Sequence, residues 1–194
     1  MSFKDLDEIE KELKKIQNEK RFRHTTGVEY TSACLAMRWG ADLHKALLAG
    51  LLHDCAKHMK PQDLLKECIE KKIPYTKAQE RSPFLLHGPV GAYFARNKYG
   101  VKDQEVLGAI TWHTTGRPGM TLLEKIVFTA DYIEPGRDQA PDLERLRQMA
   151  FTDLDGAVVL ILRQTLDYLE ESGAQIDPMT RDTYEYYRKM KREV

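Results

Sequence analysis

The chain has 194 residues, 42% of them hydrophobic and 31% charged, a size that suits one compact domain with a sizeable core. Lys plus Arg and Asp plus Glu each number 30, so the balance excludes the basic excess typical of nucleic-acid or anionic-membrane binding. The longest apolar run, Ala46 to Leu52, is far shorter than the ~20 residues that cross a bilayer. The amino terminus does not resemble a signal peptide, and the three cysteines lack CxxC spacing. We expect a cytoplasmic protein that binds neither nucleic acid nor membrane.

The apolar residues recur with helical period almost throughout, and no segment alternates as a strand would. We therefore expect an all-α fold with about eight or nine helices. The expected helices run from Phe3 to Ile16, over about 21–39, from Asp42 to Asp54, over about 61–71, from Pro89 to near Gly100, after Asp103, after Thr121, and over about 142–171 and 179–192. The helix at 142–171 contains a candidate interruption around Asp155 and Gly156.

Capping residues support several of these boundaries. Gly40 suits the left-handed conformation that ends a helix. Asp42 and Asp103 are typical N-cap residues, and Thr121 with Glu124 has the spacing of a capping box.

Ionisable residues lie on faces that should be buried. His24 shares the face of the apolar residues that follow it at helical spacing, and Asp131 follows apolar residues at the same spacing. His53 and Asp54 close an apolar helix, with Asp54 on its apolar stripe. Each residue alone has an ordinary structural interpretation, because a histidine on an apolar face is usually a core residue. Together they form a candidate site.

A cation would explain this set of residues. A buried carboxylate is costly unless it is protonated, paired or bound to a cation. No Lys or Arg lies on the same faces as Asp54 and Asp131. Imidazole and carboxylate together suit Fe, Mn, Co, Ni or Zn better than Mg or a thiophilic ion. We therefore predict a transition-metal site held by His24, His53, Asp54 and Asp131.

The order His24, His53-Asp54, Asp131 resembles the H…HD…D signature of the HD superfamily of all-helical metal-dependent phosphohydrolases. Within it, the chain resembles the bacterial YqeK-type branch, the symmetrical bis(5′-nucleosyl)-tetraphosphatases. The segments that carry this resemblance are RFRHTTGV (21–28), AGLLHDCAK (49–57), LLHGPVGA (85–92), AITWHTTG (109–116) and FTADYIEPGR (128–137). It implies one HD domain over 1–194, with a motif core at 21–137 and a helical carboxy-terminal extension at 141–194.

The resemblance also implies an activity, the hydrolysis of diadenosine tetraphosphate to two ADP by metal-activated water. Asp54 and Asp131 would orient the water, and His87 or His113 would protonate the departing ADP. Lys57 would neutralise charge at the phosphates.

Substrate binding is expected from residues in the same motifs. Basic side chains would contact phosphate, Arg137 through its bidentate guanidinium and Lys57 as a point charge. His87 precedes a first-turn proline, so it would lie at a helix amino terminus that favours phosphate. The full set is Arg21, Lys57, His87, His113, Thr114 and Arg137.

His87, His113 and Glu134 each have an alternative role. His87 and His113 could hold a second metal instead of contacting phosphate; we prefer one ion, iron, with both histidines on the substrate. Glu134 is interpreted as structural, although it could orient a ligand histidine.

Other functions compete with this prediction. An HD phosphohydrolase could act on another nucleotide, a six-ligand HD site could support di-iron oxygenation, and a nucleotide-sensing module could bind without turnover. The amino-terminal amphipathic helix could be part of the core or the interface of a homodimer.

Overall fold

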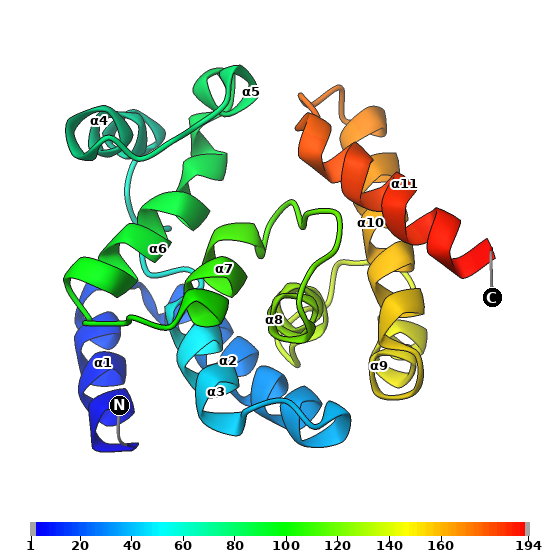
Figure 1. Ribbon diagram of the computed structural model, residues 1–194, viewed down its shortest axis with the longest axis horizontal. Helices are drawn as coiled ribbons and strands as arrows, with labels where there is room; N and C mark the ends of the chain where they lie inside the picture. The colour runs from blue at the N-terminus through cyan, green and yellow to red at the C-terminus, as the bar shows by residue number, and fades with distance from the viewer. Residues whose placement is uncertain (1–2, 193–194) are drawn as a thin grey trace.

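The computed structural model describes the backbone of residues 3–192 and the side chains of residues 6–191 (Figure 1). This part of the chain is all α, as expected, with 11 α-helices, one short 3₁₀ helix and no strand. The helices are α1 (Phe3–Ile16), α2 (Glu19–Trp39), α3 (Leu43–Leu52), α4 (Pro61–Lys71), α5 (Lys77–Arg81), η1 (Pro83–Leu86), α6 (His87–Asn97), α7 (Gln104–Trp112), α8 (Leu122–Ile133), α9 (Leu143–Thr152), α10 (Leu154–Glu171) and α11 (Pro178–Arg192).

The expected number of helices was slightly too low for two reasons. The short α5 and η1 were not anticipated, because segments of about one turn carry too little periodicity to detect. The long helix expected at 142–171 is two helices. The break falls at Asp153, in an extended conformation, where its side chain accepts a hydrogen bond from the Gly156 amide. Asp153 is thus the N-cap of α10, two residues before the expected interruption.

The predicted caps are confirmed. Asp42, Asp103 and Thr121 accept amide hydrogen bonds at the starts of α3, α7 and α8, and Glu124 completes the capping box of α8. Gly40 ends α2 in the left-handed conformation, with φ of 73°. The boundaries of these helices are therefore set by local side-chain and backbone chemistry.

The core lies where α2, α3, α7, α8 and α10 pack together. Its apolar side chains come from helices along most of the chain, from Leu6 in α1 to Tyr187 in α11. A smaller cluster joins α4, η1 and α6 around Leu64, Leu86 and Val90. Figure 1 shows α6, α7 and α8 between the α4–α5 region and the α10–α11 pair.

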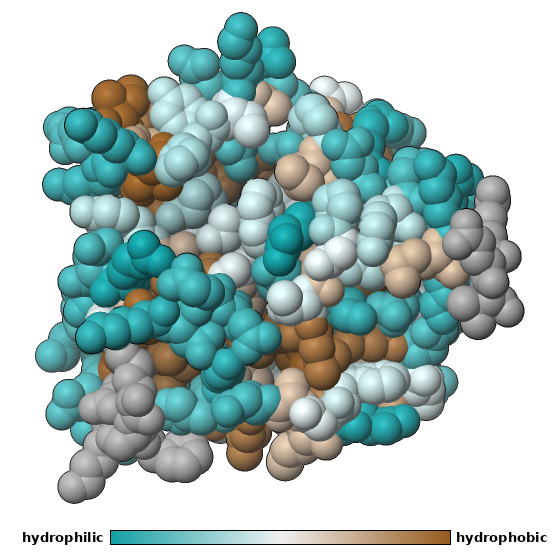
Figure 2. Space-filling model, in the orientation of Figure 1, coloured by the Kyte–Doolittle hydropathy of each residue, from teal (hydrophilic) through white to brown (hydrophobic). Residues whose placement is uncertain are grey.

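The surface is mainly polar on the face shown in Figure 2, where hydrophilic residues surround small apolar areas. None of the described helices combines the length and the apolar character needed to span a bilayer.

Candidate metal centre

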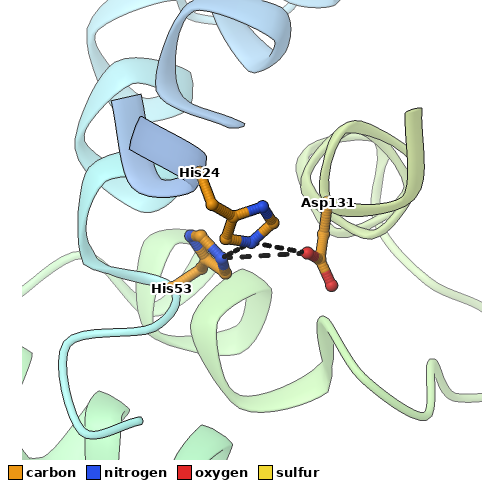
Figure 3. A group of neighbouring side chains, drawn as sticks. All are labelled: His24, His53 and Asp131. Atoms are coloured by element: carbon orange, nitrogen blue, oxygen red, sulfur yellow. Dashed lines mark hydrogen bonds and ion pairs between the residues drawn. The ribbon is translucent and has the colours of Figure 1, made fainter. Parts of the chain in front are cut away.

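The four predicted metal ligands lie together at the meeting point of three helices. His24 lies within α2, His53 is the C-cap of α3, Asp54 follows in the turn, and Asp131 belongs to the last turn of α8. Figure 3 shows His24, His53 and Asp131 directed toward one another from these elements. Because the helices come from distant parts of the sequence, packing of the core brings the ligand atoms together.

One oxygen of Asp54 faces the first pair of histidines. Asp54 Oδ2 lies 3.9 Å from His24 Nε2 and 3.6 Å from His53 Nε2. Asp131 Oδ1 lies 3.0 Å from His24 Nε2 and 3.9 Å from His53 Nε2. We call this group, made of His24, His53, Asp131 and Asp54 Oδ2, the Oδ2 side. The ligand atoms of His24, His53 and Asp131 all lie within 4.8 Å of one another, close enough to share a cation.

The other oxygen of Asp54 faces a second pair of histidines. Asp54 Oδ1 lies 3.4 Å from His87 Nε2 and 3.5 Å from His113 Nε2. Lys57 Nζ lies 3.2 Å from His87 Nε2, and Thr114 Oγ1 lies 3.1 Å from the same nitrogen. We call the group of His87, His113, Lys57, Thr114 and Asp54 Oδ1 the Oδ1 side.

The hydrogen bonds behind the four rings determine which nitrogen faces the centre. Each Nδ1 has an acceptor: the Gly50 carbonyl for His53 at 2.6 Å, the Phe84 carbonyl for His87 at 2.5 Å, the Ile110 carbonyl for His113 at 2.7 Å and the Glu134 carboxylate for His24 at 3.0 Å. A neutral imidazole that donates from Nδ1 has an unprotonated Nε2. In this neutral form, each Nε2 offers a lone pair at the centre, toward Asp54 and, for His24, also toward Asp131.

This convergence of acceptors fits a bound cation. The Nε2 atoms of His24 and His53 lie 3.3 Å apart, and those of His87 and His113 lie 3.0 Å apart. Asp54 is 3% exposed, and its Oδ1 atom has no hydrogen-bond partner among the described residues. Buried lone pairs that face one another without a donor are unfavourable unless a proton or metal ion lies between them.

Comparisons with known proteins identify the family. The HD domain model matches residues 21–136, which include every ligand described above. A symmetrical bis(5′-nucleosyl)-tetraphosphatase from Halalkalibacterium halodurans is 45% identical over 86% of this chain and 88% of that protein. One of the same name from Bacillus subtilis is 40% identical over 90% of this chain and 92% of that protein.

This chain belongs to the HD family of symmetrical bis(5′-nucleosyl)-tetraphosphatases. The fold agrees with that assignment. A crystal structure from Clostridium acetobutylicum, described as a predicted HD superfamily hydrolase involved in NAD metabolism, has a TM-score of 0.92 and 36% identity. The match covers 98% of both chains. The likeness to that structure therefore extends over the carboxy-terminal helices, beyond the residues 21–136 that the HD model matches.

The remaining predicted substrate residues border the HD centre. Arg21 Nη1 donates to Asp54 Oδ2 at 2.6 Å, and Arg137 Nη2 donates to Asp131 Oδ1 at 2.9 Å. Both arginines are partly exposed, with side-chain exposures of 34% and 45%. Each guanidinium thus lies between a candidate ligand and solvent, where an incoming phosphate would arrive. All ten residues predicted for the site lie in this one network.

Electrostatics keep the rings of His53 and His87 neutral, whereas at His24 the effect of burial is outweighed by Asp131 and Glu134, which raise its pKa. Burial lowers the pKa of His53 to about 4, and burial together with Lys57 lowers that of His87 to about 3. Although burial opposes ionisation, the surrounding histidines hold the pKa of the Asp54 carboxyl well below its ordinary value. Neutral imidazoles and an ionised carboxylate are the ligand forms that metals require.

One contact of the HD site was not predicted. Gln17, in the bend between α1 and α2, is 7% exposed, and its side chain donates to the Asp54 carbonyl at 3.4 Å. Its side-chain oxygen accepts a hydrogen bond from Thr25 at 3.0 Å. Gln17 supports the backbone that carries Asp54. No spacing rule marks a single glutamine between two helices, so the sequence contains no signal for this role.

Proposed function

We propose that this protein hydrolyses diadenosine tetraphosphate symmetrically to two molecules of ADP, with a bound transition-metal ion. The observation that carries the proposal is the convergence of His24, His53 and Asp131 on Asp54 in a chain 40–45% identical to enzymes of that name. Neither the geometry nor the sequence identity suffices alone, because an HD fold occurs in several phosphohydrolases and a His/Asp cluster can bind several metals.

The metal would be held by His24, His53 and Asp131, whose ligand atoms lie within 4.8 Å of one another, together with Asp54, whose Oδ2 faces the two histidines. This mixed nitrogen and oxygen donor set suits Fe best among the candidates in our proposal, with Mn, Co, Ni or Zn as substitutes. A bound ion supplies Lewis-acid activation of water and neutralises charge on phosphate. We propose one ion as the active form.

The substrate phosphates would bind on the Oδ1 side and at the two arginines. Lys57 is mostly buried at a distance of 3.2 Å from His87, which places a positive charge beside the carboxylate centre. Arg21 and Arg137 lie at the solvent edge and can exchange a carboxylate partner for a phosphate oxygen. Thr114 can donate its hydroxyl hydrogen to a phosphate oxygen in place of His87.

Proton movements would use the same side chains. Asp54 and Asp131 are acceptors when ionised, so they can orient an attacking water. His113 or His87, which adjoin Asp54 Oδ1, would protonate the departing ADP. Nε2 of the donating ring must first take up a proton, because it is unprotonated in the neutral form. Attack of water on one of the two inner phosphorus atoms, with cleavage of the central bridge, gives two ADP.

The chain would act as one HD domain over residues 1–194. The core supports this, because buried side chains from α1, α8 and α11 belong to a single apolar cluster. We also propose a cytoplasmic location, where nucleotide substrates are present.

The test is product analysis with purified protein. Metal-free protein should be inactive, and addition of Fe²⁺ or Mn²⁺ should convert diadenosine tetraphosphate to ADP alone. In water enriched in oxygen-18, one of the two ADP molecules should carry one labelled oxygen. AMP plus ATP would show asymmetric cleavage and overturn the proposal.

A substrate panel separates the competing functions. Faster turnover of a deoxynucleotide or guanosine polyphosphate would indicate another phosphohydrolase. Tight ADP binding without hydrolysis under any metal would indicate a sensing module, and oxygen uptake would indicate an oxygenase.

A further inference from the structure

His24 differs from the other three histidines of the centre in its position in a helix. His53 and His113 follow the last residues of α3 and α7, and His87 follows η1. The last carbonyls of a helix have no intrahelical donor, so those of the preceding turn are available to the Nδ1 hydrogens. The three rings accordingly use backbone carbonyls three residues earlier.

His24 cannot donate its Nδ1 hydrogen to a backbone carbonyl of the preceding turn in this way. It is the sixth residue of the 21-residue helix α2, so the carbonyls of the preceding turn accept hydrogen bonds within the helix. Its Nδ1 needs an acceptor from another element. Glu134, 110 residues later and at the C-cap of α8, supplies a carboxylate oxygen at 3.0 Å.

Glu134 and Asp131 therefore hold opposite nitrogens of one ring. Both come from the end of α8, one helical turn apart, and each places an oxygen 3.0 Å from His24. Glu134 is 3% exposed, and its second oxygen accepts the Gly136 amide hydrogen bond at 2.5 Å. A carboxylate oxygen accepts, so the hydrogen bond between Glu134 and His24 is donated by Nδ1–H. A metal ion at Nε2 would take the place of any hydrogen shared with Asp131. This arrangement leaves Nε2 for the metal.

The surrounding backbone makes room for this carboxylate. A Cβ on Gly27 would lie 2.5 Å from Glu134 Oε2, and a Cβ on Gly136 would lie 2.9 Å from the same atom. Gly27 lies inside α2, where glycine costs about 1 kcal/mol relative to alanine. The Glu134 carboxylate fills the space that a side chain at Gly27 would occupy. Helix α2 therefore provides both His24 and the room for Glu134 beside it.

We propose that Glu134 is a positioning residue that fixes the Nδ1–H tautomer and ring orientation of His24, and so sets the affinity of the metal centre. The proposal deepens the proposed function and rests on the metal site described there. Glu134 does not contact the substrate; it acts through His24. Partners of this kind typically change metal affinity by about 10- to 100-fold.

The first test measures the tautomer in metal-free protein. Nitrogen-15 NMR of the imidazole rings at pH 8, with the His24 signals assigned by their loss in His24→Asn, should show Nδ1–H in the wild type. Glu134→Ala should shift His24 toward a mixture of tautomers. An unchanged Nδ1–H tautomer in Glu134→Ala would overturn the proposal. This readout needs neither metal nor activity, so it remains informative if the hydrolase assignment fails.

The second test measures binding of Mn²⁺ alone. We expect its Kd to rise about 10- to 100-fold in Glu134→Ala. The matched control is Glu124→Gln, which alters another buried, hydrogen-bonded glutamate of α8. Glu124 lies seven residues before Asp131 and is paired with Arg117. The control should lose stability but retain the wild-type Kd. If Glu134→Ala and Glu124→Gln bind Mn²⁺ with the same Kd, the role of Glu134 is only structural.

A third variant covers the case in which Glu134→Ala does not fold. Gly27→Ala removes no charge, but its Cβ would displace the Glu134 carboxylate from its position beside His24. It should weaken Mn²⁺ binding in the same direction and broaden the His24 tautomer signal. A folded Gly27→Ala protein with the wild-type tautomer and Kd would contradict the proposal.

Discussion

The two sides of Asp54 contain similar histidines but different charges. On the Oδ2 side, His24 and His53 face a second carboxylate, Asp131, and Glu134 stands behind His24. On the Oδ1 side, the residues in contact with His87 include the ammonium of Lys57. Arg21 and Arg137 offset the carboxylates of the Oδ2 side, but both are partly exposed and can exchange these partners for phosphate. Carboxylates freed in this way attract a cation, whereas the Lys57 ammonium repels one and attracts phosphate.

This difference supports one metal ion on the Oδ2 side and phosphate on the Oδ1 side. The geometry alone would also allow a second ion, since His53, Asp54 and His113 form another group with ligand atoms within 4.8 Å. Charge distinguishes the two sides, because a second ion near His87 would lie close to Lys57.

The largest effect is expected from Asp54→Asn, because Asp54 belongs to both sides. We expect hydrolysis to fall by more than about 100-fold, beyond what is typical of residues that only orient a ligand. Turnover of diadenosine tetraphosphate and metal content should fall together. A variant that retains more than a tenth of the wild-type rate would show that Asp54 is not central.

The contrast between the sides is tested by His53→Ala and His113→Ala. With one ion, His53→Ala should lose the metal, whereas His113→Ala should keep one equivalent and lose about 100-fold in kcat through loss of a proton donor. Metal titration and steady-state kinetics measure both. Two equivalents in the wild type and one in His113→Ala would mean that both sides bind metal.

A smaller effect is expected from Lys57→Met. Removal of a charge-assisted contact with phosphate costs about 1.5–3 kcal/mol, or about 10- to 100-fold in kcat/KM. Lys125→Met is the matched control, since Lys125 is a partly buried lysine near the start of α8 and is paired with Asp155 of α10. If Lys57→Met retains wild-type kinetics, the Oδ1 side does not bind phosphate.

The smallest effect on hydrolysis is expected from a change at Glu29, a buried carboxylate outside the HD centre. Burial, together with Glu10 and Asp7, raises the pKa of Glu29 to about 7, opposite to the lowered pKa of Asp54. A carboxyl with a raised pKa in the folded state destabilises the protein as the pH rises from 4.5 to about 7. Glu29→Gln should therefore raise the free energy of unfolding by about 3 kcal/mol at pH 8 and have little effect at pH 4. Denaturant unfolding at both pH values measures this, and equal effects would contradict it.

The sequence alone was sufficient for the fold class and for the four candidate ligands. Apolar periodicity and caps such as Asp42 and Thr121 are local, so they could be recognised without knowing how the helices pack. The candidate ligands were recognised because a charged side chain on an apolar stripe needs a partner, as for Asp54 and Asp131. The same reasoning could not locate α5 or place the break at Asp153, because each depends on one or two residues.

Only the tertiary structure decided how these residues are arranged around Asp54. Spacing gives the direction of a side chain around its own helix, but not the position of that helix against its neighbours. The division of His24 and His87 between the two oxygens of Asp54, and the Gln17 support, depend on that packing. The Glu134–His24 hydrogen bond joins residues 110 positions apart. It requires α2 and α8 to meet where Gly27 leaves room, a condition that helical periodicity does not encode.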